Sequence, residues 1–205
     1  MWTPTTVGFR KEWLIRVGHA QPVHYIPSSV KRIGHKALCS PALSVIVPDT
    51  VEELEADSFS GESISLPHRF EGQGEFIKAM LEHVSTVVIR GEEEGTICNA
   101  YFLPNRALDC VGNGSPAMAV IDAARTDGPD ASNALLDSYY KEIKPKEFPT
   151  RFRLALCRYF SVAQTDKALQ KKYRDYVRRT REKGRAMLED LGGDVYLSLM
   201  DALGF

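Results

Sequence analysis

Proline is distributed unevenly along this 205-residue chain, and this limits where long helices can form. Six of the eleven prolines fall within the first 70 residues. Because proline lacks an amide hydrogen and its ring clashes with the preceding helical turn, this region favours short strands and turns. Beyond Pro149 there is no proline, and apolar residues recur at helical spacing. The sequence therefore predicts an α+β protein, with a β-containing part over about 1–145 and a helical part over about 146–205 that either packs on it or projects from it.

Two strand-like runs joined by a polar turn give the clearest local prediction. Residues 86–90 and 96–103 are rich in β-branched and aromatic residues, and Gly91 and Gly95 bound the turn between them. This pattern predicts a β-hairpin over about 86–103. We expect an antiparallel sheet with the hairpin at its centre, and an amphipathic helix over 74–84. No internal repeat is evident.

The longest predicted helix lies near the end of the chain. Residues 165–191 carry an apolar stripe at helical spacing, and Gly192 and Gly193 end the pattern. Shorter helices are expected over 131–143, 150–163 and after residue 194. Beyond the prolines at 145 and 149 the chain is therefore expected to be helical almost to its end.

Charge is sorted by position along the chain, although the formal net charge is only −1. Residues 1–140 carry 11 Lys and Arg against 18 Asp and Glu, whereas residues 141–185 carry 15 against 5. The last twenty residues carry four acidic residues and no Lys or Arg. A basic segment behind an acidic body indicates contact with a polyanion, or with the acidic surface of another protein or copy.

Six of the basic residues of the long helix fall on one straight row. They are spaced 4, 3, 4, 3 and 4 residues apart, which returns each to the same side of an α-helix. A solvated surface helix usually alternates both signs, because like charges at i,i+4 repel. We therefore predict a phosphate-binding face made of the basic row and two arginines from the preceding helix: Lys167, Lys171, Arg174, Arg178, Arg181 and Arg185, with Arg151 and Arg153.

This face predicts a non-enzymatic protein that binds or coats nucleic acid, RNA rather than DNA, and that self-assembles into a homo-oligomer. Binding would be largely independent of base sequence, since it would use phosphate contacts. The alternative is a scaffold, inhibitor or regulator that docks the same face on an acidic protein surface. The acidic residues at 52–57 and 92–94 are candidate partners for the basic face in a second copy. An ordinary solvated helix with no specific partner is the third interpretation.

Aromatic residues near the basic segment offer a second kind of contact. Rings among cations can stack on bases. At helical spacing most of these rings are expected in the core. Tyr139, Tyr140 and Phe148, which lie near the predicted boundary, are the better candidates for stacking.

An enzyme is the less favoured interpretation. Cys98 and Cys110, with His83, have the residue types of a thiol nucleophile and its base. Residues 112–115, Gly-Asn-Gly-Ser, could form a phosphate-binding helix start, but they lack the lysine of a P-loop. The histidines and cysteines show no metal-ligand spacing, so neither a metal nor a cofactor is expected.

Nothing in the sequence predicts a membrane protein. No apolar run approaches the ~20 residues that cross a bilayer. The N-terminal residues lack the continuous apolar segment of a secretory signal. Four scattered cysteines without paired spacing fit free thiols in an intracellular protein.

Overall fold

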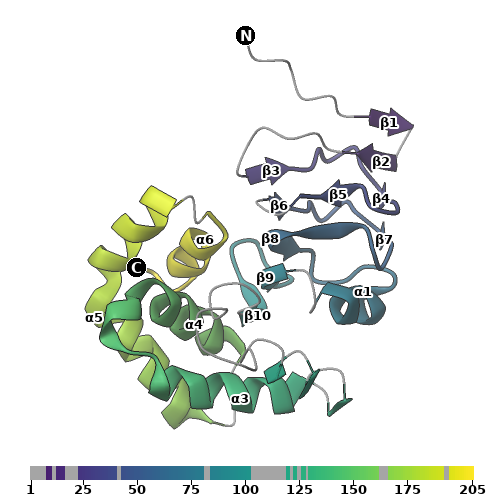
Figure 1. The fold of residues 1–205 in the computed structure, drawn as a ribbon. Coiled ribbons are helices and arrows are strands. Elements are labelled where there is room, and N and C mark those ends of the chain that lie inside the picture. The colour runs from purple at the N-terminus through teal and green to yellow at the C-terminus, as the bar shows by residue number, and fades with distance from the viewer. Residues whose placement is uncertain are drawn as a thin grey trace.

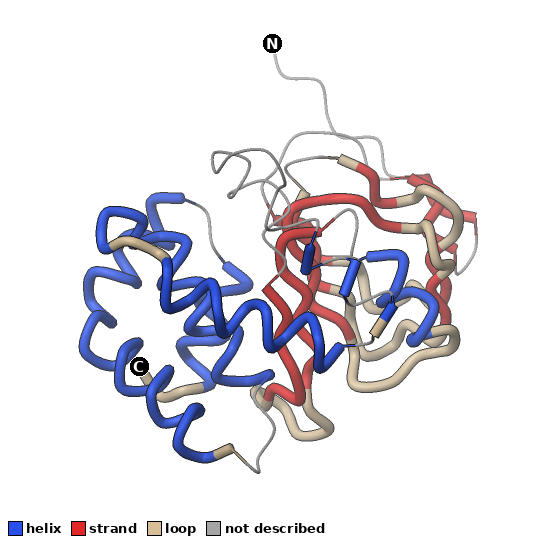
Figure 2. The backbone as a smooth tube through the Cα atoms, turned by 60° about the horizontal axis from the view of Figure 1, so that its bottom comes forward, coloured by secondary structure: helices blue, strands red, loops and turns tan. Residues whose placement is uncertain are grey.

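A computed structural model of the chain places the strands on one side of the molecule and most of the helices on the other (Figures 1 and 2). This arrangement confirms the α+β class. The predicted helix start at 112–115, together with Cys110 and His83, lies outside the residues that the structure describes. Those residues are 8–10, 13–16, 23–40, 43–80, 84–102, 119–120, 122–123, 126–127, 129–161, 166–191 and 194–205.

Short parallel strands build a solenoid in the first part of the chain. The pairs Val23 with Ser44, Arg32 with Glu53 and Leu38 with Phe59 are each 21 residues apart. Three separate strand pairs with one offset mean that the chain completes a full coil in about 21 residues. The strands are β3 (Val23–Tyr25), β4 (Arg32–Ile33), β5 (Leu38–Cys39), β6 (Ser44–Ile46), β7 (Glu53–Leu54) and β8 (Phe59–Leu66).

A recurring turn starts each coil, and it corrects the expectation that the chain has no internal repeat. Residues 26–30 and 47–51 both read as a β-branched residue, proline, two polar residues and valine. The amide of Val30 donates to the carbonyl of Pro27 over 3.0 Å, and Val51 donates to Pro48 over 3.1 Å. Residues 66–70, Leu-Pro-His-Arg-Phe, keep the proline and the two polar positions, with leucine and phenylalanine at the two outer positions. The repeat is therefore present in the sequence as spaced prolines.

Stacked apolar side chains fill the solenoid. Ile33 pairs in register with Leu54, and both are buried. Phe59, which pairs with Leu38 of the coil before, is also buried. Since a single coil cannot cover its own apolar face, neighbouring coils stabilise one another by burying a continuous core.

Antiparallel strands lie beyond both ends of the parallel stack. β1 (Gly8–Arg10) pairs antiparallel with β2 (Trp13–Arg16), which runs parallel to β4. At the other end β9 (Val84–Arg90) runs parallel to β8 and antiparallel to β10 (Ile97–Phe102). The predicted hairpin is thus confirmed. It lies at the edge of a mixed sheet in the order β10-β9-β8-β6-β3, and not at the centre of an antiparallel one.

The helices form the second part of the molecule, apart from α1 (Gln73–Met80), whose Phe76 is buried in the solenoid core. α4 (Phe148–Ser161) packs against both β10 and α5 (Lys167–Leu191), and α6 (Asp194–Ala202) packs against α4 and α5. Val88 and Ala100 of the hairpin share one apolar cluster with the helices, so the two parts pack together. The remaining elements are α3 (Pro129–Glu142) and the short 3₁₀-helix η1 (Pro145–Glu147).

Candidate nucleic-acid interface

One face of α5 is held in the core, and this fixes which face is turned outward. Tyr173, Val177 and Leu188 are fully buried. Gly184 lies on the same face, where a Cβ atom would come within 2.1 Å of Cζ of Phe152. Close packing of α4 on α5 therefore requires a residue without a side chain at position 184.

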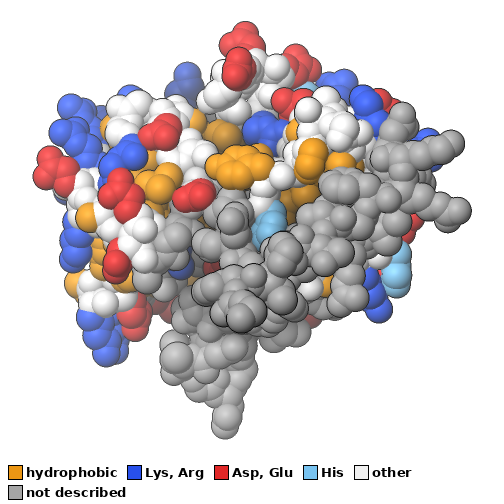
Figure 3. Space-filling view, turned by 90° about the horizontal axis from the view of Figure 1, so that it is seen from above, with side chains coloured by type: hydrophobic (Ala, Val, Ile, Leu, Met, Phe, Trp, Pro, Cys, Tyr) orange, Lys and Arg blue, Asp and Glu red, His pale blue; other side chains and the backbone are white. Residues whose placement is uncertain are grey.

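Five residues of the predicted basic row form one exposed line along a flank of α5, about a quarter turn from the buried face, and we call this line the α5 row. Within the described part of the chain, none of these five side chains forms an ion pair. Lys and Arg side chains gather on the helical side of the molecule, at the left of Figure 3. The α5 row consists of Lys167, Lys171, Arg174, Arg178 and Arg181.

Arg185, the sixth residue of the predicted row, binds residues near the C-terminus. One guanidinium nitrogen, Nη2, donates to Asp201 Oδ1 over 2.7 Å and to the carbonyl oxygen of Phe205 over 2.5 Å. These contacts join α5 to the C-terminal turn after α6. Arg185 thus has a partner within the fold, whereas the five residues of the α5 row have none among the described residues.

Arg151 and Arg153 are half-buried and belong to the packing of α4. The guanidinium of Arg151 lies 4.8 Å from the ring centre of Tyr140 and 5.3 Å from that of Tyr176. Arg153 lies 5.1 Å from the ring centre of Tyr196. The structure therefore does not bring these two arginines into the α5 row, because their cationic groups cover aromatic rings.

The predicted stacking residues contribute to the core. Tyr140 is buried, with its ring edge-on to those of Tyr173 and Tyr176, and Tyr139 and Phe148 pack as partly buried residues against the same cluster. The other flank of α5, which carries Lys172, Arg179 and Lys183, places two cations over these rings. Lys183 lies 4.3 Å from the ring centre of Phe148, and Lys172 lies 5.6 Å from that of Tyr140.

A buried polar cluster that the sequence did not predict joins three helices. Arg158 of α4 is 3% exposed and donates to both carboxylate oxygens of Asp137 of α3, over 2.8 and 2.9 Å. The hydroxyl of Tyr173 of α5 donates to the same carboxylate over 2.5 Å. Burial and the adjacent Asp137 raise the pKa of Tyr173, which keeps this hydroxyl protonated as a donor. The cluster fixes the position of α5, but its residues meet only through the tertiary fold.

Charges in the solenoid are arranged differently from those of the α5 row. Lys31 forms an ion pair with Glu52 over 3.1 Å, and Arg32 with Glu53 over 3.2 Å. Each pair joins residues 21 positions apart, so the coil itself brings opposite charges together.

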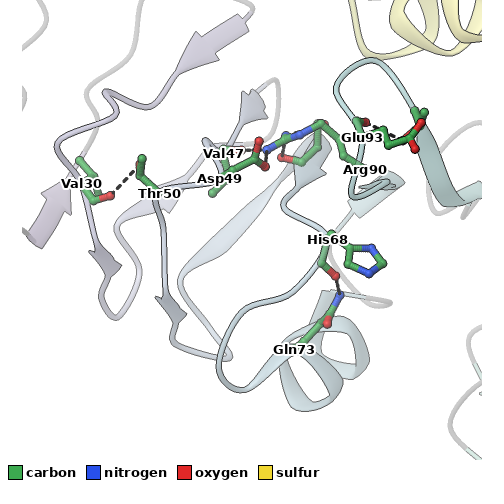
Figure 4. A network of polar contacts seen from close by, with 10 residues as sticks. Val30, Val47, Asp49, Thr50, His68, Gln73, Arg90 and Glu93 are labelled. Atoms are coloured by element: carbon green, nitrogen blue, oxygen red, sulfur yellow. Dashed lines mark hydrogen bonds and ion pairs between the residues drawn. The ribbon is translucent and has the colours of Figure 1, made fainter.

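The guanidinium of Arg90, at the end of β9, also has its hydrogen-bond partners within the fold (Figure 4). Its guanidinium donates to Asp49 Oδ1 over 2.6 Å, to the carbonyl of Val47 over 2.5 Å and to Ser65 Oγ over 3.1 Å. These acceptors come from the two preceding coils. The arginine therefore links the hairpin to the solenoid.

The surface beside the α5 row forms an open hollow of about 770 Å³. Its lining includes Arg178, Arg181 and the two acidic residues Asp175 and Glu182. The lining residues that the structure describes all come from two to three turns of α5, so they bound the hollow on one side only. Such a surface fits an extended ligand better than a small molecule.

The cysteines do not gather into a thiol site among the described residues. Cys39 and Cys98 are exposed, on β5 and β10 respectively. Cys157 is buried in α4, and burial raises its pKa. A buried thiol of raised pKa is a poor nucleophile.

One His–carboxylate cluster occurs on the solenoid where the sequence predicted no metal ligands. Donor atoms of His35, Glu55 and Asp57 lie within 4.8 Å of one another, and His35 Nδ1 contacts Asp57. The coil brings these residues together from positions about 20 apart, which no local spacing reveals. His35 and Asp57 are both more than half exposed, and exposed groups of this kind are well solvated without an ion.

Comparison with known proteins identifies no relative: no protein-family model, curated protein or solved structure matches the chain. Among the helices of the described residues, none is both long enough and apolar enough to span a bilayer. The function is therefore argued from the site alone.

Proposed function

We propose that this protein is a non-enzymatic nucleic-acid-binding protein that contacts phosphates through the α5 row. The supporting observation is the contrast in charge pairing. Arg32, Arg90 and Arg158 each have a carboxylate partner within the fold. Across the described residues the α5 row has five cations and no such partner.

Like charges within the α5 row repel one another in the free protein. Lys167 with Lys171 and Arg174 with Arg178 are like charges at i,i+4, which destabilise a helix by about 0.2–0.5 kcal/mol per pair. A line of phosphates relieves that repulsion when it binds. Counterions released from the nucleic acid add a favourable term that weakens steeply as salt is raised.

A matched pair of triple variants tests the proposal. Replacing Arg174, Arg178 and Arg181 by Gln removes three charges from the α5 row. Replacing Lys172, Arg179 and Lys183 by Gln removes three charges from the other flank of the same helix. Both variants have the same net charge, so any difference in binding reports the position of the charges.

We expect the row variant to bind a fluorescent nucleic acid on the order of 10²-fold more weakly than the parent at about 0.1 M salt, because three phosphate contacts are lost. The flank variant should bind within a few-fold of the parent. Fluorescence anisotropy over a salt series measures both, and circular dichroism confirms that each variant is folded. Equal losses in the two variants would show that only net charge matters and would contradict the proposal.

The alternative partner is an acidic protein surface, including that of a second copy. Two acidic residues of the 52–57 stretch, Glu52 and Glu53, already pair with Lys31 and Arg32, so they offer less free charge to another copy. Glu93 and Glu94 in the hairpin turn are exposed and form no ion pair with another described residue. Self-assembly is therefore tested separately, by light scattering with and without nucleic acid at two salt concentrations.

A further inference from the structure

We infer that the α5 row binds double-helical nucleic acid in preference to single strands, an inference that rests on the proposed function. Two independent features support it. The first is that the aromatic rings near the row are covered, and the second is that the row is straight.

The first feature is that aromatic rings near the row are covered. Tyr173 is fully buried, and Tyr176 is partly buried beneath Arg151. Across residues 129–161, 166–191 and 194–205 no described aromatic side chain is exposed, and residues 162–165 and 192–193 contain no aromatic residue. Proteins that hold single strands without sequence preference combine a basic groove with rings on which bases stack. The α5 row has the cations without the rings.

The uncharged polar side chains of α5 that could read base edges are also engaged. Gln170 is the one amide side chain in α5, and its Nε2 donates to the carbonyl of Tyr159 over 3.3 Å. The hydroxyl of Thr180 donates to the carbonyl of Tyr176 over 2.8 Å. The long, flexible cations are thus the groups left to meet a ligand, which favours contact with the phosphate backbone over contact with bases.

The second feature is the straight line that the helix imposes. Lys167 and Arg181 are separated by fourteen residues, or ~21 Å along the axis, with a cation every ~4.5–6 Å. A duplex presents one charge per ~1.7 Å of its axis, about twice the linear density of one strand. It is also stiff over ~150 base pairs, so it meets a straight row without being ordered first. A single strand would lose conformational entropy in following the same line.

Acidic residues beside the α5 row restrict phosphate binding to the row itself. Asp175 and Glu182 border the hollow between the α5 row and the other flank of the helix. These carboxylates repel phosphates that stray from the row. One line of contact along α5 matches one phosphate backbone of a duplex, or one edge of a groove.

The experiment compares four labelled probes of one base sequence: single-stranded RNA, single-stranded DNA and their two duplexes, each about 20 nucleotides long and thus longer than the ~21 Å row. Full-length protein and both triple variants are titrated by anisotropy from low to high salt. We expect duplexes to bind at least about tenfold more tightly than single strands. With five phosphates neutralised, log K should fall against log salt with a slope near −4.5 for duplex DNA, against −3.5 for a single strand.

The outcomes separate the two claims. If single strands bind as tightly as duplexes, and the row variant weakens both, the inference is wrong and the proposed function stands. If no probe binds at low salt, or if the row and flank variants lose affinity equally, the proposed function fails and the inference fails with it. Duplex preference that is lost in the row variant and kept in the flank variant supports both.

Discussion

The solenoid and helix α5 both carry charged residues at regular spacing, but they use that spacing in opposite ways. In the solenoid a 21-residue coil sets Lys31 beside Glu52 and Arg32 beside Glu53. In α5, spacings of three and four residues set cations beside cations, as in Arg174 and Arg178. A regular repeat can therefore neutralise charge within a fold or display it to a partner. The difference lies in which residue types the repeat brings together.

The largest effect on stability is expected at the buried ion pair of the helical part. Like the charges of the solenoid, this buried charge has an opposite charge beside it. Asp137→Ala would leave Arg158, 3% exposed, without a counter-charge. We expect the free energy of unfolding to fall by about 3–5 kcal/mol, measured by urea denaturation. Asp201→Ala removes the partner of the more exposed Arg185 and should cost under about 1 kcal/mol. Similar losses in the two variants would show that burial of the Asp137–Arg158 pair is not what matters.

A smaller effect on stability is expected at Gly184, where α5 packs against α4. Gly184→Ala would place a Cβ atom 2.1 Å from Cζ of the buried Phe152. Within an unhindered helix the same change stabilises by about 1 kcal/mol, but overpacking here should destabilise by about 1–3 kcal/mol. Thermal unfolding measures the sign directly. Combining the change with Phe152→Leu should recover part of the loss, whereas a stabilising Gly184→Ala would mean that α4 and α5 are not packed this closely.

The smallest effects test the comparison itself, because they should have opposite signs. Lys31→Gln removes a paired charge from the solenoid and should lower the free energy of unfolding, by less than about 1 kcal/mol. Arg174→Gln removes a cation that has no ion-pair partner among the described residues and whose charged neighbours at i−3 and i+4, Lys171 and Arg178, are both cations. This change should raise the free energy of unfolding by about 0.2–0.5 kcal/mol per relieved contact. Added salt should shrink both changes by screening. Changes of the same sign, from replicate urea titrations at low salt, would contradict the contrast drawn between the two regions.

Local patterns in the sequence predicted several elements correctly. The hairpin of β9 and β10 and the helices α1, α3, α4, α5 and α6 were expected near their observed bounds. Their periodicity depends on residues only a few positions apart. The solenoid was missed, although the prolines at 27 and 48 mark its 21-residue coil. All of its strands before β8 are two or three residues long, which is too short to show alternation.

What the sequence alone determined about the candidate site is the straight row of cations on α5, since helical geometry places residues 167, 171, 174, 178 and 181 on one side of any α-helix. Only the tertiary structure decided which cations remain without a partner. It turned Arg151 onto Tyr140, joined Arg185 to Asp201 and buried Arg158 against Asp137. The physical reason is that the position of a charge along a helix is local, whereas its neutralisation depends on residues that meet only when distant segments pack.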